Sequence, residues 1–409
     1  MRKLMTYVLS FFVLILPIAT KKVTVLKHNV GLLDLLLFSI FILYFLNLLV
    51  KKDSRNRFKK GFIDFFRDPL TIFSFLLVIL MFVSSSYAMD KKLAFTESIR
   101  FATYIILYFI IKNEFDYKDS KRMLLSYITS ITLVSVFGII QFFTKIGLNP
   151  KYIVNYGHGS IVRIHSSFQN PNALGAFLIL GIFPIFMMAM GIKRKRLIWI
   201  LTFLLVLLAI ILTGSRNALV AFGVGMLILV ISYNFKLILG FILALVAAFM
   251  VPEVRYRLLD LFSKTQNESR IKLWKTAIAM IKEHPLRGIG NGNYTVRYDE
   301  YVKKYPSLKY PDYHNMPSHN SYLKIQSELG IGGIISFLGL LIFSIFKIKK
   351  LINRTRDRFI KSFYTGFLAS MIAFLFMNFS DNMFFIPEIA MSYWIIVALC
   401  DNISYNDLV

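Results

Sequence analysis

The sequence predicts an all-α fold, a polytopic membrane helix bundle of about twelve transmembrane helices. Of the 409 residues, 56% are hydrophobic and 16% are aromatic, and apolar runs recur from one end of the chain to the other. Soluble domains are less apolar than this. A run of roughly 20 apolar residues is long enough to cross a bilayer as a helix. We therefore interpret residues 1–409 as a single integral membrane domain.

The predicted spans follow the apolar runs in order, and several are shorter than the bilayer core, so their boundaries are approximate. They are residues 5–20, 30–50, 69–88, 94–112, 124–142, 173–191, 197–213, 218–233, 237–251, 322–346, 362–380 and 386–400. The first span has a basic start like a signal peptide, but LPIATKK offers no convincing cleavage site, so we expect a retained helix.

Orientation is predicted from Lys and Arg in the short loops. Residues 51–68 and 347–361 carry seven basic residues each, and the turn 192–196 carries four. All three loops lie on one side of a twelve-span chain, together with the amino terminus. We therefore expect both termini in the cytoplasm, with the long segment 252–321 outside as an extracytoplasmic loop between the ninth and tenth spans.

The net charge of +26 requires an explanation. The cytoplasmic loops hold about half of the basic residues, and topology and anionic lipids, which attract each nearby Lys or Arg by about 1 kcal/mol, explain these. Nucleic acid is not expected, because no recognition motif or soluble domain is present. Membrane lipids and an anionic lipid-linked substrate are the expected partners of the remaining basic residues.

Metal and thiol chemistry find no support in the sequence. There is one cysteine, Cys400, and there is no HExxH, cysteine pair or Asp-x-Asp that would hold a divalent ion. We expect a metal-independent protein without a cofactor.

The long outer segment contains a predicted interfacial helix that begins at Arg270. Its apolar stripe, at helical spacing, consists of Ile271, Trp274, Ile278 and Ile281. Gly288, Gly290 and Gly292 follow. Their spacing resembles a phosphate-binding loop, but no strand precedes them and no helix obviously follows, so the nucleotide motif is weak.

Candidate site residues gather on the outer side. All six histidines are predicted there: His28, His158, His165, His284, His314 and His319. Three span starts on this side carry capping residues: Asn170 and Asn172 before the sixth, Gly214-Ser215-Arg216 before the eighth, and Ser318-His319-Asn320 before the tenth. Helix amino termini attract anions, and Arg163, Arg216 and Arg270 would strengthen this attraction. The pattern predicts a site for a phosphate-rich group at the membrane boundary.

Each candidate also has a simpler interpretation. Arg216 is either a snorkelling side chain or a functional cation, and positive charge on an outer turn favours function. Arg270 and Arg163 are alternatively solvated surface residues. His319 is either a neutral capping residue or a proton-transfer group. Glu328 lies four residues after Lys324, which predicts an ion pair or a role in holding the active-site helix.

Four motifs in order resemble the O-antigen ligase and polymerase family, over about residues 163–343. HNSYLKIQSELGIGG, from His319, is similar to the family's His-[Asn/Ser]-x-x-Leu-x-x-x-x-Glu-x-Gly pattern. Before it stands an Arg-x-x-x-Trp helix with a Pro-x-x-Gly-x-Gly turn (Arg270, Trp274, Pro285). TGSRNALVAF and RIHSSFQNPNALGAFL resemble the family's Ser-Arg turn and Phe-x-Asn-Pro-Asn stretch.

The resemblance implies a metal-independent glycosyltransferase of the bacterial cytoplasmic (inner) membrane, working on its outer face. It would transfer a glycan from undecaprenyl diphosphate to an acceptor hydroxyl, such as a lipid A-core sugar. His319 would be the base or positioning group, and Arg216 and Arg270 would hold the diphosphate. Arg163, Asn170, Asn172, Trp274 and Glu328 would shape the binding pocket.

Two alternatives to the ligase stay open. A polysaccharide polymerase uses the same donor and passes the glycan to another lipid-linked glycan, and the compact His-to-Gly pattern favours the ligase. A lipid-glycan flippase or exporter also fits twelve spans, but transporters place ionisable groups near the bilayer midplane, whereas here they gather at one face.

Overall fold

The computed structural model describes residues 1–19, 22–25, 28–156, 159–239, 242, 255 and 264–406. The amino-terminal half comprises α1 (Arg2–Ile15), β1 (Lys22–Val25), β2 (His28–Gly31), α2 (Leu32–Val50), α3 (Lys52–Phe65), α4 (Pro69–Ser84), α5 (Lys91–Glu114), α6 (Tyr117–Thr144), η1 (Pro150–Tyr152), β3 (Ile153–Tyr156) and β4 (Gly159–Val162). The remainder comprises α7 (Pro171–Gly191), α8 (Arg196–Leu212), α9 (Arg216–Ser232), α12 (Lys264–Glu283), α13 (Tyr294–Lys304), η3 (Pro306–Leu308), α14 (Ser321–Arg354), α15 (Arg358–Met377), η4 (Met383–Phe385) and α16 (Pro387–Asn406).

The protein is a helical membrane protein. Six helices, α2, α5, α6, α7, α14 and α15, are long and apolar enough to cross a bilayer, and α3 with α4 makes a seventh candidate bent by 81°. Eleven of the twelve predicted spans coincide with helices, and most of the twelfth, 237–251, lies outside the described residues. Twelve membrane crossings remain a prediction, since α1, α8 and α9 have only 14 to 17 residues.

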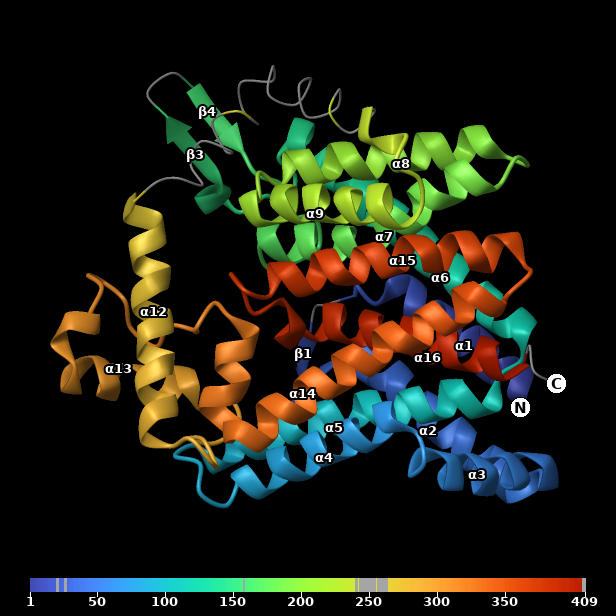
Figure 1. Ribbon diagram of the computed structural model, residues 1–409, viewed down its shortest axis with the longest axis horizontal. Helices are drawn as coiled ribbons and strands as arrows, with labels where there is room; N and C mark the ends of the chain where they lie inside the picture. Colours follow the sequence, from blue (N-terminus) through green and yellow to red (C-terminus); the bar gives the residue numbers. More distant parts are fainter. Residues whose placement is uncertain are drawn as a thin grey trace.

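Two antiparallel hairpins were not predicted from the sequence. β1 pairs with β2 and β3 pairs with β4, four residues to a strand. Both hairpins connect helix ends, so the bundle keeps its helical architecture (Figure 1).

Helix starts follow the capping chemistry of the sequence. Asp68 accepts a hydrogen bond from Leu70 N before Pro69 opens α4, and Asp90 accepts one from Leu93 N at the start of α5. Such caps satisfy N–H groups that have no partner within the helix. They fix where each span begins.

The core centres on α7 and α15, which pack along each other (Figure 1). Of the apolar stretch of α7, 89% is buried within the protein. A Cβ on Gly366 of α15 would lie 2.2 Å from the carbonyl oxygen of Phe183, so the two backbones touch at this glycine. Close approach at small residues is how helices associate in membranes.

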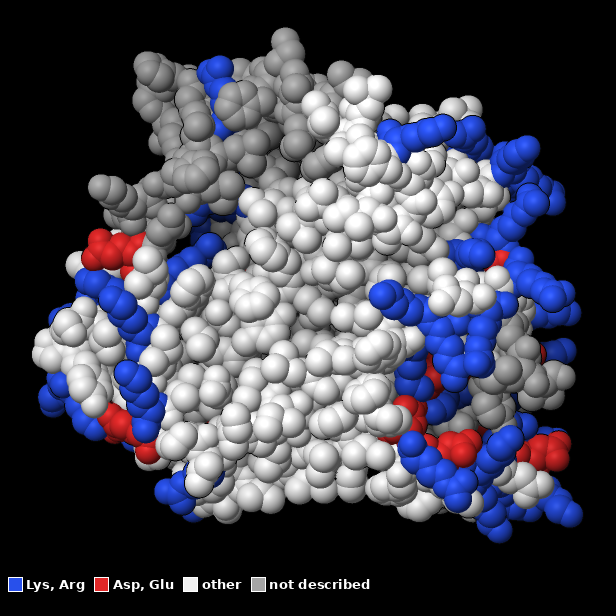
Figure 2. All heavy atoms as spheres, in the orientation of Figure 1, with Lys and Arg blue, Asp and Glu red and all other residues white. Residues whose placement is uncertain are grey.

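The two ends of the bundle differ. Both chain termini lie at one end, and α12 lies across the other end, over the ends of the long helices (Figure 1). Figure 2 shows Lys and Arg concentrated at both ends, with a broad uncharged band between them. This arrangement agrees with helices that cross a bilayer and with α12 at its surface.

The packed face of α12 differs from the predicted stripe. Leu273, Ala277 and Met280 are buried against α13, whereas Ile271 and Ile278 are 45% and 40% exposed. The helix therefore has two apolar stripes, one packed on protein and one facing outward. A helix also follows the glycine-rich turn, because α13 begins at Tyr294, contrary to the expectation from sequence.

Candidate functional site

His319 lies in the turn that opens α14, at the end of the bundle crossed by α12. Asn320 caps this helix, since its Oδ1 accepts hydrogen bonds from Tyr322 N and Leu323 N, both at 3.0 Å. The cap is therefore Asn320, and it leaves the His319 ring free for another role. His319 has a φ of 47°, a left-handed conformation that non-glycine residues rarely adopt.

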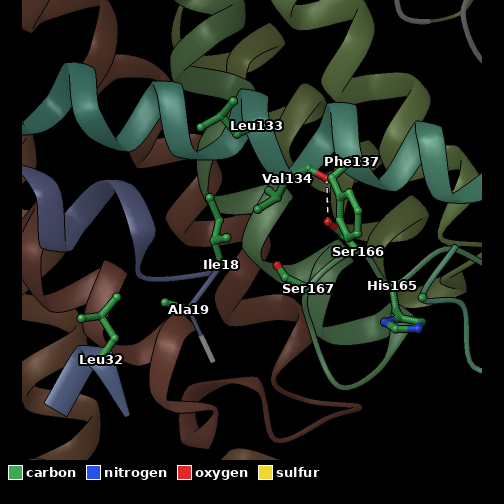
Figure 3. Close-up of a pocket in the computed structure, with 10 residues that line it drawn as sticks. Ile18, Ala19, Leu32, Leu133, Val134, Phe137, His165, Ser166 and Ser167 are labelled. Carbon is green, nitrogen blue, oxygen red and sulfur yellow. Dashed lines mark hydrogen bonds between the residues drawn. The ribbon is translucent and has the colours of Figure 1, made fainter. Parts of the chain in front are cut away.

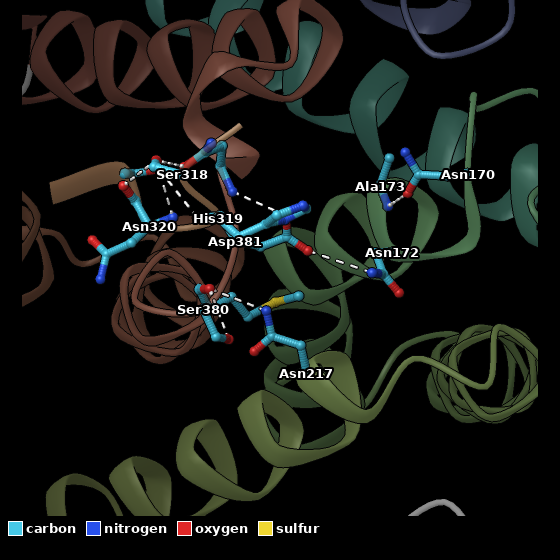
Figure 4. Close-up of polar contacts among 12 residues, drawn as sticks. Asn170, Asn172, Ala173, Asn217, Ser318, His319, Asn320, Ser380 and Asp381 are labelled. Carbon is cyan, nitrogen blue, oxygen red and sulfur yellow. Dashed lines mark hydrogen bonds and ion pairs between the residues drawn. The ribbon is translucent and has the colours of Figure 1, made fainter. Parts of the chain in front are cut away.

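Asp381 is the partner of His319 (Figure 4). Its Oδ1 lies 3.1 Å from Nδ1 of the imidazole, and the two side chains are 10% and 30% exposed. The geometry assigns the proton to Nδ1, which donates to the carboxylate, and Nε2 is left to meet a substrate. A buried carboxylate that orients a histidine and stabilises its protonated form is the arrangement that general bases require.

The connection between α15 and α16 holds Asp381 in place. Ser321 N donates to Asn378 O at 2.9 Å, and Asn320 Nδ2 donates to Phe379 O at 2.9 Å. The start of α14 is thus bonded to the residues just before Asp381. The histidine and the carboxylate, 62 residues apart in sequence, are fixed by the same contacts.

A polar chain extends from Asp381 to Arg163. Asp381 Oδ2 accepts from Asn172 Nδ2 at 3.4 Å, and Asn172 Oδ1 accepts from Arg163 Nη2 at 3.0 Å. Arg163 Nε also donates to Thr213 O at 3.0 Å, just before the turn that opens α9. This series of hydrogen bonds therefore connects His319 to the start of α7 and to the turn before α9.

Asn170 and Ser215 cap α7 and α9, as the sequence predicts. Asn170 Oδ1 accepts from Ala173 N at 2.9 Å, and Ser215 Oγ accepts from Ala218 N at 3.4 Å. Arg216 is the first residue of α9, and its neighbour Asn217 donates to Met377 O at 3.0 Å (Figure 4). Arg216 thus stands next to a residue that is bonded to the end of α15.

α12 joins the site through Trp274. The indole Nε1 donates to the backbone oxygen of His319 at 3.2 Å. Arg270 lies one turn before Trp274 on the same helix, so it shares a face with it. Contacts thus bring together His319, Asn172, Arg163 and Trp274. Arg270 shares a helix face with Trp274, and Arg216 lies three residues after Thr213, whose backbone oxygen accepts from Arg163.

Glu328 has a different environment from the other candidates. It is fully buried, its Oε2 accepts from Gly292 N at 2.9 Å, and its Oε1 accepts from Tyr294 N at 3.1 Å. It also forms the predicted ion pair with Lys324. The ion pair that the sequence suggested is therefore present, and the contacts with Gly292 and Tyr294 hold the glycine-rich turn against α14.

The turn at Gly288–Gly292 uses its own N–H groups within the protein. Every backbone N–H from Gly288 to Tyr294 donates to a protein acceptor: His284 O, Ser327 O, Glu328 O, Ser84 Oγ, Glu328 Oε2, Gly290 O and Glu328 Oε1. Gly288, Gly290 and Gly292 have φ values of 70°, 106° and 72°. The turn is therefore an anion nest whose anion is the carboxylate of Glu328 rather than a phosphate.

The turn between α4 and α5 closes the other side of this nest. Asp90 N donates to Asn293 Oδ1 at 2.7 Å, and Asn291 N donates to Ser84 Oγ at 3.0 Å. A Cβ on Gly290 would lie 2.5 Å from Cβ of Ala88. The third and fourth predicted spans thus supply the turn that holds the loop before the site.

The other histidines have structural partners or lie apart. His165 donates from Nδ1 to Phe168 O at 2.8 Å and accepts from Asn149 N at 3.3 Å, and burial lowers its pKa. The exposed His314 lies 3.5 Å from Asp299. His158 and the side chain of His28 lie outside the described residues.

A cavity of about 750 Å³ lies beside His165 (Figure 3). Its walls are apolar side chains of Ile18, Leu32, Leu133 and Phe137, and Ser166 and Ser167 line its polar side. The volume lies within the roughly 300–1,000 Å³ of ligand sites. Arg163 is two residues from His165, so the cavity lies close in sequence to the polar chain.

Among the described residues there is no group of three or more His, Cys, Asp or Glu side chains placed to hold a metal ion. The chemistry available in this part of the chain is that of a histidine–carboxylate pair, arginines and helix amino termini. Metal independence remains a prediction.

The fold and the site together define a polytopic helical membrane protein with a polar cluster at one end of its bundle. Residues 201–338 match the family model described as O-antigen ligase. The matched range contains Arg216, Arg270, Trp274, His319 and Glu328, and it ends before Asp381. No curated protein matches the chain.

Proposed function

We propose that this protein is a membrane glycosyltransferase that transfers a glycan from undecaprenyl diphosphate to an acceptor hydroxyl, such as that of a lipid A-core sugar. The observation that carries the proposal is the contact between Asp381 and His319, which lies within the residues that match the O-antigen ligase model. A histidine in this arrangement accepts a proton from a hydroxyl group near neutral pH.

In the proposed reaction the acceptor oxygen attacks the anomeric carbon of the donor sugar. The bond from that carbon to the diphosphate oxygen breaks, and the diphosphate leaves with the electron pair. Nε2 of His319 takes the hydroxyl proton, and Asp381 stabilises the imidazolium that forms. Two bonds form, carbon to oxygen and nitrogen to hydrogen, and two bonds break.

Arg216 and Arg270 would bind the leaving diphosphate. Negative charge grows on this group as the sugar bond breaks, so preorganised cations stabilise the transition state more than the ground state. The amino termini of α7, α9 and α14, each capped in the structure, add partial positive charge on the same side. Arg163 and Asn172 would keep the carboxylate of Asp381 in position.

The polyprenyl chain of the donor needs an apolar surface that reaches this end of the bundle. The cavity beside His165 supports the proposal because it offers apolar walls in the same region. The reaction would take place on the outer face of the cytoplasmic membrane, with both termini on the inner face.

A transfer assay with purified protein in detergent tests the proposal. The donor is an undecaprenyl diphosphate glycan, supplied with and without a lipid-core acceptor and with and without EDTA. We expect glycan on the core, unchanged by EDTA and abolished in His319→Ala at unchanged protein abundance. Lengthened lipid-linked glycan would assign a polymerase. No transfer to either acceptor would contradict the proposal and favour a flippase.

A further inference from the structure

Helix α3 lies at the end of the bundle opposite His319 (Figure 1). One face of α3 is bonded to α5. Glu114 of α5, 1% exposed, pairs with Arg57 at 2.6 Å and accepts from Ser54 Oγ at 3.1 Å. A Cβ on Gly61 would lie 2.5 Å from the side chain of Asn113. α3 is therefore a fixed part of the surface rather than a loose loop.

The remaining apolar face of α3 borders a groove of about 380 Å³. The groove runs between α3 and the spans α2, α4 and α5. Its aromatic walls are Phe58, Phe62, Phe65 and Phe66 of α3, Phe75 of α4 and Phe109 of α5. Its volume lies within the range of roughly 300–1,000 Å³ of small-molecule sites. Phe62 and Phe66 are 51% and 46% exposed, so an apolar occupant would cover them.

Basic side chains surround α3. Lys51, Lys52, Arg55, Lys59, Lys60 and Arg67 are all exposed, and Figure 2 shows Lys and Arg clustered over this corner of the molecule. Lys52 and Lys59 are seven residues apart and share one side of the helix. Phe62 lies three residues beyond Lys59, so cation and aromatic groove are neighbours.

We propose that α3 and its groove form a binding site for an anionic diacyl phospholipid. One acyl chain lies in the aromatic groove, and the phosphate group meets Lys52 and Lys59. Negative charge on the headgroup complements the basic rim, and the chain covers the exposed phenylalanines. None of these residues belongs to the His319 site, so the inference stands apart from the proposed transfer reaction.

Native mass spectrometry of the full chain in neutral detergent tests this site. The probes are phosphatidylglycerol and phosphatidylcholine with identical acyl chains. We expect the anionic lipid to be retained preferentially. Lys52→Gln combined with Lys59→Gln should weaken its binding about 25-fold, since each basic residue near an anionic group contributes roughly fivefold. The matched control is Lys349→Gln with Lys350→Gln, two exposed lysines of α14 at the same end of the bundle.

Phe62→Ser is the second variant, because it puts a polar side chain in place of an exposed aromatic wall of the groove. It should weaken the binding of both lipids. Equal retention of the two lipids by the unaltered protein would overturn the proposal, as would unchanged binding in the lysine variant. A concentration-dependent dimer that the same substitutions abolish would assign the groove to a second copy of the chain instead.

Discussion

Asp381 determines what His319 is able to do. A histidine that faces only solvent titrates freely and adopts either tautomer, whereas a carboxylate oxygen 3.1 Å from Nδ1 fixes the proton there. The ring is 30% exposed and the carboxylate 10%, so a substrate reaches the ring and not the acid. The pair thus presents one basic nitrogen in one orientation.

Asp381→Asn is expected to lower kcat on the order of 100-fold, the usual contribution of a positioned base, with little change in KM. The amide still accepts a hydrogen bond, but it does not stabilise the imidazolium. Steady-state kinetics of glycan transfer measure this. Asp312→Asn, an exposed acid of the same outer segment, is the control and should be silent. An unchanged kcat in Asp381→Asn would remove the carboxylate from the mechanism.

Arg216→Lys should lower kcat/KM about 10- to 100-fold, the equivalent of one charge-assisted hydrogen bond. A lysine keeps the charge but not the planar fork that binds two phosphate oxygens. The comparison is Arg194→Lys, an exposed arginine in the turn between α7 and α8. If both variants kept full activity, Arg216 would be a snorkelling side chain.

At the scale of single elements, α14 is two helices joined at Gly330. This residue has φ 67° and ψ −160°, and Ile331 N donates to Pro285 O at 2.9 Å instead of continuing the helix. The first segment carries His319 at its start and Glu328 near its end. The break allows that segment to pack against the glycine-rich turn while the second segment runs through the bundle.

Gly330→Ala should therefore destabilise the protein. A Cβ would lie 2.1 Å from the carbonyl oxygen of Leu286, and the backbone conformation alone costs about 1–3 kcal/mol in a residue other than glycine. The melting temperature in detergent should fall. Gly332→Ala, whose Cβ would meet only the flexible end of Leu80 at 3.3 Å, should change it little. Equal melting temperatures would contradict the broken helix.

Contact between α12 and α13 depends on the charge of Glu283. Hydrogen bonds from Lys304, Tyr305 and Tyr301 lower the pKa of Glu283 to about 2. Because the folded pKa lies below the ordinary value of 4.5, the carboxylate stabilises the pair above about pH 4.5. This stabilisation is lost as the pH falls toward 2.

Hydrogen exchange of residues 294–304, corrected for the intrinsic rate, should therefore be slow at pH 6 and faster near pH 2.5. Glu283→Gln should exchange fast at both values, because the neutral amide forms no ion pair with Lys304. Identical protection of this segment in the variant and the unaltered protein at pH 6 would show that α13 is held by its tyrosines alone.

At the scale of the whole molecule, the charged residues lie mainly at the two ends of the bundle. One end carries α3, both termini and the turn at 192–196, and the other carries α12, α13 and the His319 site (Figure 1). Basic residues are abundant at both ends (Figure 2). The short basic loops at the first end are those that orient a membrane protein toward the cytoplasm.

Cysteine labelling tests this orientation. With Cys400→Ala as background, Asp312→Cys should react with an impermeant maleimide in cells whose outer surface is open to the reagent. Lys193→Cys should react only after the membrane is permeabilised. Both positions are exposed, so access to the side chain does not limit the reaction. Labelling of both positions from the same side would refute the predicted topology.

Much of the fold and part of the site could be predicted from the sequence. Apolar runs specify helices through composition alone, and the caps at Asn170, Ser215 and Asn320 are local, so both are visible in short windows. Candidates such as His319 and Arg163 stand out because they lie in segments predicted to be on the outer side, near the starts of apolar spans.

The remaining parts depend on contacts between distant residues. Asp381 lies 62 residues after His319 in an apolar carboxyl-terminal region. The one signal for it in the sequence is that it is an acidic residue between two predicted spans. The role of Glu328 depends on the backbone N–H groups of Gly292 and Tyr294. The sequence does not predict that these groups point toward Glu328. The sequence does contain a signal for α13, since Tyr294, Tyr298 and Tyr301 recur at helical spacing. In the structure all three are buried.

The nest around Glu328 also has a consequence for how the protein is made. The turn between α4 and α5 receives its partner Asn293 from 203 residues farther along the chain. At 5–20 residues per second, a ribosome needs about 10–40 s to supply it. During that interval the α4–α5 turn has no Asn293 to bind. The contact that closes this end of the bundle therefore forms only once synthesis has reached the last third of the chain.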